Sequence, residues 1–168
     1  DVLINNAGAF VPYGHMESSS ARDWDYVMGV NAARMFLGAK AAIPPMKRIY
    51  GGSIINISSN QGITCQQNVH ASCNASKGAV HLLTKSAALQ YANVGISVNS
   101  IHPGVITTDM TATGISGSSW SQWTLSRIPI GRFGIPLEVA YGALYLASKE
   151  SHYVTDSELG INGGWTAQ

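Results

Sequence analysis

Short apolar runs alternate along the chain with longer segments in which apolar residues recur at helical spacing. Residues 1–5 (DVLIN) form an apolar run of the kind found in strands that are covered on both faces. Similar runs at 53–59 (SIINISS), 96–102 (ISVNSIH) and 158–163 (ELGING) predict further strands. Because helical segments separate these strands, the pattern predicts an α/β fold with a parallel sheet and crossover helices.

Helical spacing marks the segments between the strands. The first helix is expected at about residues 24–46, with its cap among Ser18 to Ser20 and Asp23 and the prolines at 44–45 disturbing its last turn. Two more are expected at about 73–92 and 136–148. The chain therefore predicts a regular alternation of strand and helix.

Two connections are predicted to be loops. A polar loop covers residues 60–72, and a Ser-, Thr- and Gly-rich segment covers about 105–132. A connection as long as the second is usually a lid or a binding loop. We expect it to select the substrate, and because Trp120 and Trp123 offer large apolar surfaces, we expect that substrate to be bulky and apolar.

Composition narrows the class of protein. The 168 residues contain no repeat or linker and predict one domain, and the low charged fraction of 11% suggests that apolar faces are covered in an oligomer. The net charge of +1, without a basic run, argues against nucleic-acid or membrane partners. Cys65 and Cys73 have no zinc-ligand spacing, so we expect no metal and a reducing, cytoplasmic location. We expect neither a leader nor a membrane span, and because the chain begins inside a strand pattern we interpret it as a fragment.

Four segments together resemble the short-chain dehydrogenase/reductase family along essentially the whole chain. They are Asn5-Asn6-Ala7-Gly8, GVNAARMFLGAK around Asn31, the stretch from ISSNQG to NASKGAV, and HPGVITTDM at 102–110. The resemblance implies a doubly wound, Rossmann-like parallel sheet that binds NAD or NADP. The closing segment VTDSELGINGGWTAQ also fits, with Asp156 and Asn162 as mild departures, because both residue types tolerate turn conformations.

The resemblance also implies the catalytic residues. Ser59 matches the serine that polarises the substrate carbonyl, Lys77 matches the lysine that lowers the pKa of the catalytic acid, and Asn31 matches an asparagine that holds a water in the proton relay. The family's catalytic tyrosine is replaced by Cys73. Since positions 73 and 77 share a helix face, the ammonium group should lie beside the thiol.

Cofactor contacts are implied at both ends of the site. Lys77 is expected to hydrogen-bond the nicotinamide ribose, and residues near the strand ends are expected to line the cofactor: Asn5, Ala7, Gly8, Pro103, Gly104, Ile106 and Thr108. The family's glycine-rich first turn is absent, together with the segment that selects NAD or NADP. The chain thus corresponds to the C-terminal two-thirds of the domain. Alone, it should bind dinucleotide weakly and aggregate through its open strand edge.

Cys73 admits several interpretations. A thiol beside a lysine can exchange protons, but it is shorter than tyrosine and needs an intervening water, which predicts impaired hydride transfer or a pseudoenzyme. Alternatively, it is a substitution in an active lineage, because the neighbouring motif residues are kept. A third interpretation is a thiol hydrolase in which His70 or His102 serves as the base.

The predicted function is hydride transfer between a nicotinamide cofactor and a secondary alcohol or ketone. The segments HPGVITTDM and NGGWTAQ resemble in sequence the corresponding segments of cyclic-alcohol and hydroxysteroid dehydrogenases. The alternative is a catalytically impaired subunit that keeps the oligomer interface. The resemblance implies a homotetramer assembled through the helices that begin near Trp24 and Cys73.

Overall fold

The computed structural model describes residues 1–11, 14–66, 69–115 and 119–168. Its strands are β1 (Val2–Asn5), β2 (Gly52–Ile57), β3 (Ile96–Pro103) and β4 (Glu158–Ile161). Its helices are α1 (Ala21–Met28), α2 (Arg34–Arg48), α3 (Ala71–Tyr91), α4 (Ala112–Ile115), α5 (Ser119–Ser126) and α6 (Pro136–Ala147), and a π-helical segment, Gly29–Ala33, joins α1 to α2. Short 3-10 turns lie at Met16–Ser18, Asn60–Gly62, Ala92–Val94, Lys149–Ser151 and Trp165–Ala167.

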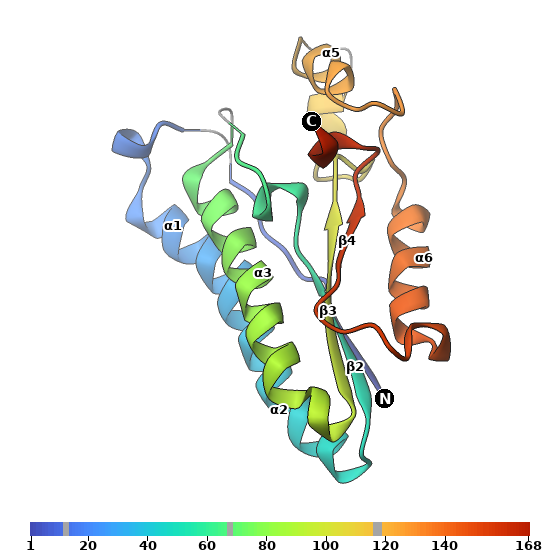
Figure 1. Cartoon of the computed structure of the whole chain (residues 1–168). Helices are drawn as coiled ribbons and strands as arrows, with labels where there is room; N and C mark the ends of the chain where they lie inside the picture. Colours follow the sequence, from blue (N-terminus) through green and yellow to red (C-terminus); the bar gives the residue numbers. More distant parts are fainter. Residues whose placement is uncertain (12–13, 67–68, 116–118) are drawn as a thin grey trace.

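The four strands form one parallel sheet in the order β1-β2-β3-β4. Helices α1, α2 and α3 lie on one side of this sheet and α6 lies on the other (Figure 1). The predicted α/β, Rossmann-like architecture is therefore confirmed. Since all strands run the same way, their carboxyl ends meet at one edge, where α5 and the C-terminus also lie (Figure 1).

Each face of the sheet has its own apolar core. Along β2, Ile54 packs with Val98 and the residues of α2 and α3, whereas Ile55 packs with Ile101 and Leu146 on the α6 side. Adjacent strand residues point to opposite faces, so an uninterrupted apolar run supplies both cores. Burial of each such side chain contributes roughly 1.5–3 kcal/mol. In the described part of the chain, no helix is long and apolar enough to cross a membrane.

The first predicted helix is correct in position, but the prolines do not disturb its end. Ser20 caps α1 by accepting a hydrogen bond from the Asp23 amide at 3.0 Å. Helix α2 continues through Pro44 and Pro45 to Arg48. Both prolines are exposed, and so are the residues four positions earlier, so water can satisfy the carbonyls that lose their helical partners.

The weak pattern of the segment 105–132 predicted a plain loop, but the structure differs. The segment contains α4 and α5, and residues 116–118 of the expected segment, like residues 67–68 of the loop at 60–72, lie outside the described residues. Trp123 packs edge-to-face on Trp165 at 6.1 Å between ring centroids, with the Arg127 guanidinium over its ring. Tertiary packing of this kind stabilises short helices that their own sequence signals only weakly.

Asp156 and Asn162 occupy positions that suit their side chains. Asp156 has a φ of 63°, in the left-handed region where Asp is tolerated better than most residues. Asn162 accepts a hydrogen bond from the Gly164 amide at 3.1 Å and ends β4 in an Asx-type turn. The two departures from the family pattern therefore fit the turns in which they lie.

Candidate active site

A cavity of about 500 Å³ opens at the carboxyl ends of β1, β2 and β3. This is the edge of a parallel sheet at which ligands usually bind. Four of its lining residues are the predicted catalytic set, Asn31, Ser59, Cys73 and Lys77. The structure thus brings together side chains that lie up to 46 positions apart in the sequence.

Asn31 ties the loop after β1 to the helical layer. It is buried within the π-helical segment, where its side chain accepts a hydrogen bond from the Ala9 amide at 2.7 Å and donates to the Ala9 carbonyl at 3.1 Å. It also donates to the Ser76 hydroxyl at 3.1 Å. The widened turn and these three bonds fix the loop against α3, beside the cavity.

The serines after β2 have different partners. The Ser58 hydroxyl donates to the Lys77 carbonyl at 3.0 Å, which links the strand to α3. The Ser59 hydroxyl donates to Asn60 Oδ1 at 3.0 Å and accepts from the Gln61 amide at 3.2 Å. Ser59 lines the cavity. Its hydroxyl can therefore donate a hydrogen bond to a ligand there instead of to Asn60.

Cys73 and Lys77 lie one turn apart on α3. The Cys73 side chain is buried beside Val11 and Val27, with 5% of the residue exposed. The Lys77 ammonium donates to the Ile57 carbonyl at 2.9 Å and lines the cavity. The strand end of β2 therefore holds the ammonium group in place.

Burial controls the protonation of this pair. It raises the pKa of the Cys73 thiol. This increase is only partly offset by hydrogen bonds with the Val11 backbone and Ser72 and by the charge of Lys77. Burial also lowers the pKa of Lys77 to about 8, against a smaller opposing effect of Cys73. The thiol is thus held in its neutral form, and the amine loses its proton more readily than an exposed lysine.

The geometry disfavours the thiol-hydrolase interpretation. His70 Nδ1 lies 2.7 Å from the Ser72 hydroxyl and caps the start of α3. His102 Nδ1 lies 2.9 Å from the Ser59 carbonyl, and its Nε2 lies 2.8 Å from the Ser100 hydroxyl. Both imidazoles are engaged elsewhere, and a thiol of raised pKa is a poor nucleophile.

A polar network leads from the site to the surface. The buried His102 ring meets His81 edge-on at 5.5 Å, His81 Nε2 lies 3.1 Å from Glu158 Oε1, and Lys85 Nζ lies 2.8 Å from the same oxygen. Desolvation by burial lowers the pKa of His102. His81, His102 and Glu158 are residue types that ligate metals, but the Lys85 ammonium already supplies a positive charge to the carboxylate.

The predicted cofactor residues do not all lie in one place. Gly8, Pro103 and Gly104 line the large cavity. Asn5 instead bonds Asn56 at 2.8 Å between β1 and β2, and Thr108 lies beside Thr111, with 3.3 Å between their hydroxyls. The Ala7 side chain is exposed on the loop after β1.

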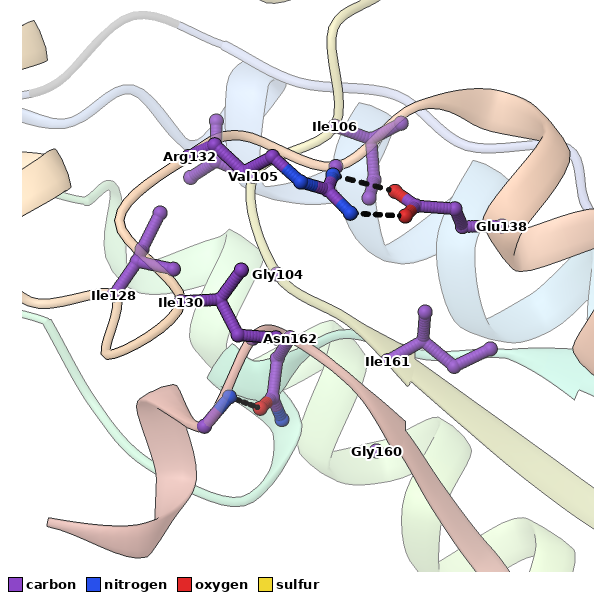
Figure 2. A pocket seen from close by; sticks show the side chains of 13 residues that line it. Gly104, Val105, Ile106, Ile128, Ile130, Arg132, Glu138, Gly160, Ile161 and Asn162 are labelled. Atoms are coloured by element: carbon purple, nitrogen blue, oxygen red, sulfur yellow. Dashed lines mark hydrogen bonds and ion pairs between the residues drawn. The ribbon is translucent and has the colours of Figure 1, made fainter.

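Ile106 belongs to a second cavity, of about 340 Å³, on the α6 side of β3. Figure 2 shows Arg132 from the preceding loop and Glu138 from α6 paired across one side of it, at 2.6 and 3.1 Å. Ile128 and Ile161 supply apolar walls. Gly104 lines both cavities, so the turn after β3 lies between them.

Of the two tryptophans expected to contact a substrate, Trp120 lines the large cavity. Trp123 packs on Trp165 instead and does not line it. Met110 and Val69 add further apolar lining, so the cavity combines apolar walls with the polar group of Ser59. Such a lining suits a ligand with an apolar body and one polar oxygen.

Some residues that shape the site were missed from the sequence. Ser76 is the partner of Asn31, and Asn60 is the acceptor for Ser59. A β-carbon at Gly62 would lie 2.6 Å from Ser58 Oγ and 2.7 Å from the Lys77 carbonyl oxygen, so only glycine allows this close approach. The small residues in ISSNQG and NASKG are the sequence signal that could have pointed to these positions.

Comparisons with known proteins find relatives along nearly the whole chain. A family model described as Enoyl-(Acyl carrier protein) reductase matches residues 1–166. Cyclopentanol dehydrogenase from a Comamonas strain is 39% identical over 167 residues, which are 99% of this chain and 66% of that protein. The 3-alpha-(or 20-beta)-hydroxysteroid dehydrogenase of Mycobacterium tuberculosis is 41% identical over 166 residues, 99% of this chain and 60% of that protein. The chain thus spans less than two thirds of the length of these relatives.

A solved structure shows the same fold. The putative 2-deoxy-d-gluconate 3-dehydrogenase from Agrobacterium tumefaciens, with bound NADP, matches with a TM-score of 0.95 at 34% identity. The match covers 100% of this chain and 68% of that chain.

Proposed function

Because the chain belongs to the short-chain dehydrogenase/reductase family, we propose that it serves in an NAD(P)-dependent oxidoreductase that interconverts a secondary alcohol and a ketone. The observation that carries this proposal is the shared cavity of Asn31, Ser59, Cys73 and Lys77 at the carboxyl ends of the strands. Such a constellation can bind a carbonyl oxygen and move a proton to or from it.

The residues present fit a nicotinamide cofactor at this edge. A β-carbon at Gly8 would point into the space beside Asn31 Oδ1, at 3.7 Å, and Lys77 Nζ, at 4.0 Å, so the glycine leaves a cradle open there. We assign the ribose hydroxyls to Lys77 and the cofactor wall to Gly8, Pro103 and Gly104, with Asn5, Ala7, Ile106 and Thr108 supporting the adjoining backbone. When bound, the nicotinamide supplies or accepts the hydride.

The polar side chains divide the remaining work. Ser59 donates its hydroxyl hydrogen to the carbonyl oxygen and stabilises the charge that develops there, a contribution of about 3 kcal/mol in comparable oxyanion sites. Cys73 exchanges the proton through a water, because its side chain is short and its raised pKa keeps the thiol protonated. Asn31 fixes the loop that closes the cavity and holds the relay water.

The test places Cys73→Tyr and Cys73→Phe in the full-length protein and compares their ketone reduction, with NADH and with NADPH, with that of the full-length wild type. Cys73→Tyr should raise kcat by about a hundredfold or more, the usual contribution of a positioned general acid, whereas Cys73→Phe supplies the ring without the hydroxyl and should not. Equal kcat values for the three proteins would contradict the assigned proton path.

We further propose an alicyclic secondary alcohol or its ketone as the substrate. The apolar walls at Val69, Met110 and Trp120 support this class. The names of two relatives, for cyclopentanol and for a 3-alpha-(or 20-beta)-hydroxysteroid, specify alcohols with an alicyclic skeleton and support it too. Trp120→Ala should raise KM for a cyclic ketone more than for acetone, while Trp123→Ala, which alters a packing residue outside the cavity, should affect both alike.

A non-catalytic subunit of a homotetramer is the second candidate. Cys73 in place of tyrosine favours it, and so do the apolar residues exposed on the helical side, among them Leu82 and Leu89 of α3 and Phe36 of α2. A tetramer measured by sedimentation equilibrium, together with no gain in activity for Cys73→Tyr, would establish this candidate over the first. The free thiols Cys65 and Cys73 suit a cytoplasmic setting for either.

A further inference from the structure

We propose that the Lys77 amine forms a reversible imine with aldehydes and ketones that enter the large cavity. This covalent carbonyl-binding activity goes beyond hydride transfer and requires no nicotinamide. The ligand class is a small carbonyl compound with an apolar body, because the cavity wall combines the amine with Val69, Met110 and Trp120.

The position of Nζ suits nucleophilic attack. One hydrogen is held by the Ile57 carbonyl at 2.9 Å, which orients the amine at the wall of the cavity. A neutral amine then still has a lone pair for a carbonyl carbon. Gly8 carries no side chain, and the position that a β-carbon would take there lies 4.0 Å from Nζ, so the glycine leaves space beside the amine.

Residue 73 determines how much room remains beside the amine. Positions 73 and 77 share one face of α3, and Cys73 ends at its sulfur atom, several ångströms before a tyrosine hydroxyl would. A tyrosine would add a ring and a hydroxyl on this face. The cysteine thus leaves the lysine accessible to a carbonyl compound in the cavity.

The surrounding groups favour the neutral amine. Burial lowers the pKa of Lys77 to about 8. The titratable groups that face it are Cys73 on α3, whose pKa is raised by burial, and His102 on β3, whose pKa is lowered by burial. Both are uncharged near neutral pH, so neither supplies a counter-charge that would hold the proton on Nζ. Desolvated lysines of this kind are suited to Schiff-base formation.

The reaction balances without an additional reagent. The Nζ lone pair forms a bond to the carbonyl carbon, and the carbonyl π pair moves to the oxygen, which takes up a proton. Loss of water from this carbinolamine gives the imine, so an amine and a carbonyl compound yield an imine and one water. Ser59, in the same cavity, can donate a hydrogen bond to the departing oxygen.

The test traps the imine on the wild-type protein. The purified chain is treated with cyclopentanone and sodium cyanoborohydride at pH 7.5 without nicotinamide, and peptide mass spectrometry measures alkylation at each of its lysines, Lys40, Lys47, Lys77, Lys85 and Lys149. Lys77 should be alkylated at least about tenfold faster than the exposed Lys40 and Lys47, because a far larger fraction of it is neutral. Its rate should level off above pH 8, while theirs continue to rise.

Two variants give a matched check. Cys73→Tyr should slow alkylation of Lys77 severalfold by occupying the adjoining space, whereas Cys73→Ala should not slow it. Alkylation of Lys77 no faster than that of Lys40 in the wild type would overturn the proposal, and that comparison within one protein needs no variant to fold. Because no hydride donor of the proposed dehydrogenase is present, its failure and a failure of the imine are separate results.

Discussion

The ammonium group of Lys77 is desolvated at the wall of the large cavity, where it donates a hydrogen bond to the Ile57 carbonyl, and this arrangement costs stability. Its pKa is lowered to about 8 in the folded chain from 10.5, so at pH 7 both states carry the proton and the folded state bears the desolvation penalty. Between about pH 8 and 10.5 the unfolded chain binds more protons than the folded chain. By linkage, the free energy of unfolding contributed by this group must rise with pH across that window.

Lys77→Met should therefore stabilise the fold at pH 7. We expect a gain of about 1–2 kcal/mol in urea unfolding, because the relief from desolvation exceeds the loss of one hydrogen bond to Ile57. The gain should shrink between pH 8 and 10.5, as the wild type itself becomes more stable. Lys40→Met, at an exposed position, is the control and should show neither effect. A gain that grows with pH would refute the assigned burial.

Asn31 contributes to stability through three hydrogen bonds made in a buried place. Replacement by alanine leaves the amide and carbonyl of Ala9 and the Ser76 hydroxyl without this partner. We expect a loss of about 2–4 kcal/mol in the free energy of unfolding, measured with urea. Asn93→Ala, at an exposed helical turn, should change it by less than about 0.5 kcal/mol. Similar losses for both variants would mean that the Asn31 bonds carry little energy.

At the scale of elements, a single carboxylate organises the start of α6. Glu138 accepts a hydrogen bond from the Ile135 amide at 2.9 Å and pairs with Arg132 through both oxygens. Hydrogen bonding to Arg132, and then to the Ile135 amide, lowers its pKa to about 2. The carboxylate's stabilising effect is thus fully present above the ordinary pKa of 4.5 and is lost as the pH falls toward 2.

An NMR titration of the Glu138 carboxyl carbon tests this arrangement. The wild-type midpoint should lie near pH 2. In Arg132→Met it should move upward toward 4.5, without reaching it, because the Ile135 amide remains. Arg22→Met removes the same charge from α1, on the opposite side of the sheet, and should leave the midpoint in place. A midpoint near 4 in the wild type would show that the pair does not persist in solution.

The elements that the sequence predicted well are those whose apolar pattern also forms the core. Strands β2 and β3 were clear because Ile54, Ile55 and Ile101 are buried on two faces. Helices α4 and α5 were missed because their support comes from distant partners, such as Trp165 beneath Trp123. The predicted helix already included Pro44 and Pro45, but the disturbance expected in its last turn was wrong, because a local rule cannot foresee which carbonyls reach water.

Much of the candidate site was predictable from the sequence for a related reason. Parallel strands end at one edge, so Ser59 after β2 and Pro103 at the end of β3 had to lie close together. The partner of each polar group was not predictable, because the selection of Asn60 for Ser59 or of Ser76 for Asn31 depends on distances of tenths of an ångström. The engagement of His102 with Ser59 and Ser100 likewise appears only in three dimensions.

At the scale of the whole molecule, the 168-residue chain presents an uncovered side at β1. This strand pairs with β2, and in the described sheet it has no second neighbour. Its residues Val2 and Ile4 are 48% and 47% exposed, although the apolar run is typical of a strand covered on both faces. An apolar strand with a free edge is a template for pairing between chains.

Ile4→Lys should therefore reduce self-association of this chain. A lysine on an edge strand opposes strand addition by charge and by its hydrated head, while the register of β1 with β2 is retained. In sedimentation velocity over a range of protein concentrations, the variant should remain a smaller species at concentrations where the wild type forms larger ones. Ile49→Lys, which places the same charge at the exposed end of α2, should behave like the wild type. Equal association of all three proteins would place the contact elsewhere, with the exposed Leu82 and Leu89 face of α3 as the next surface to alter.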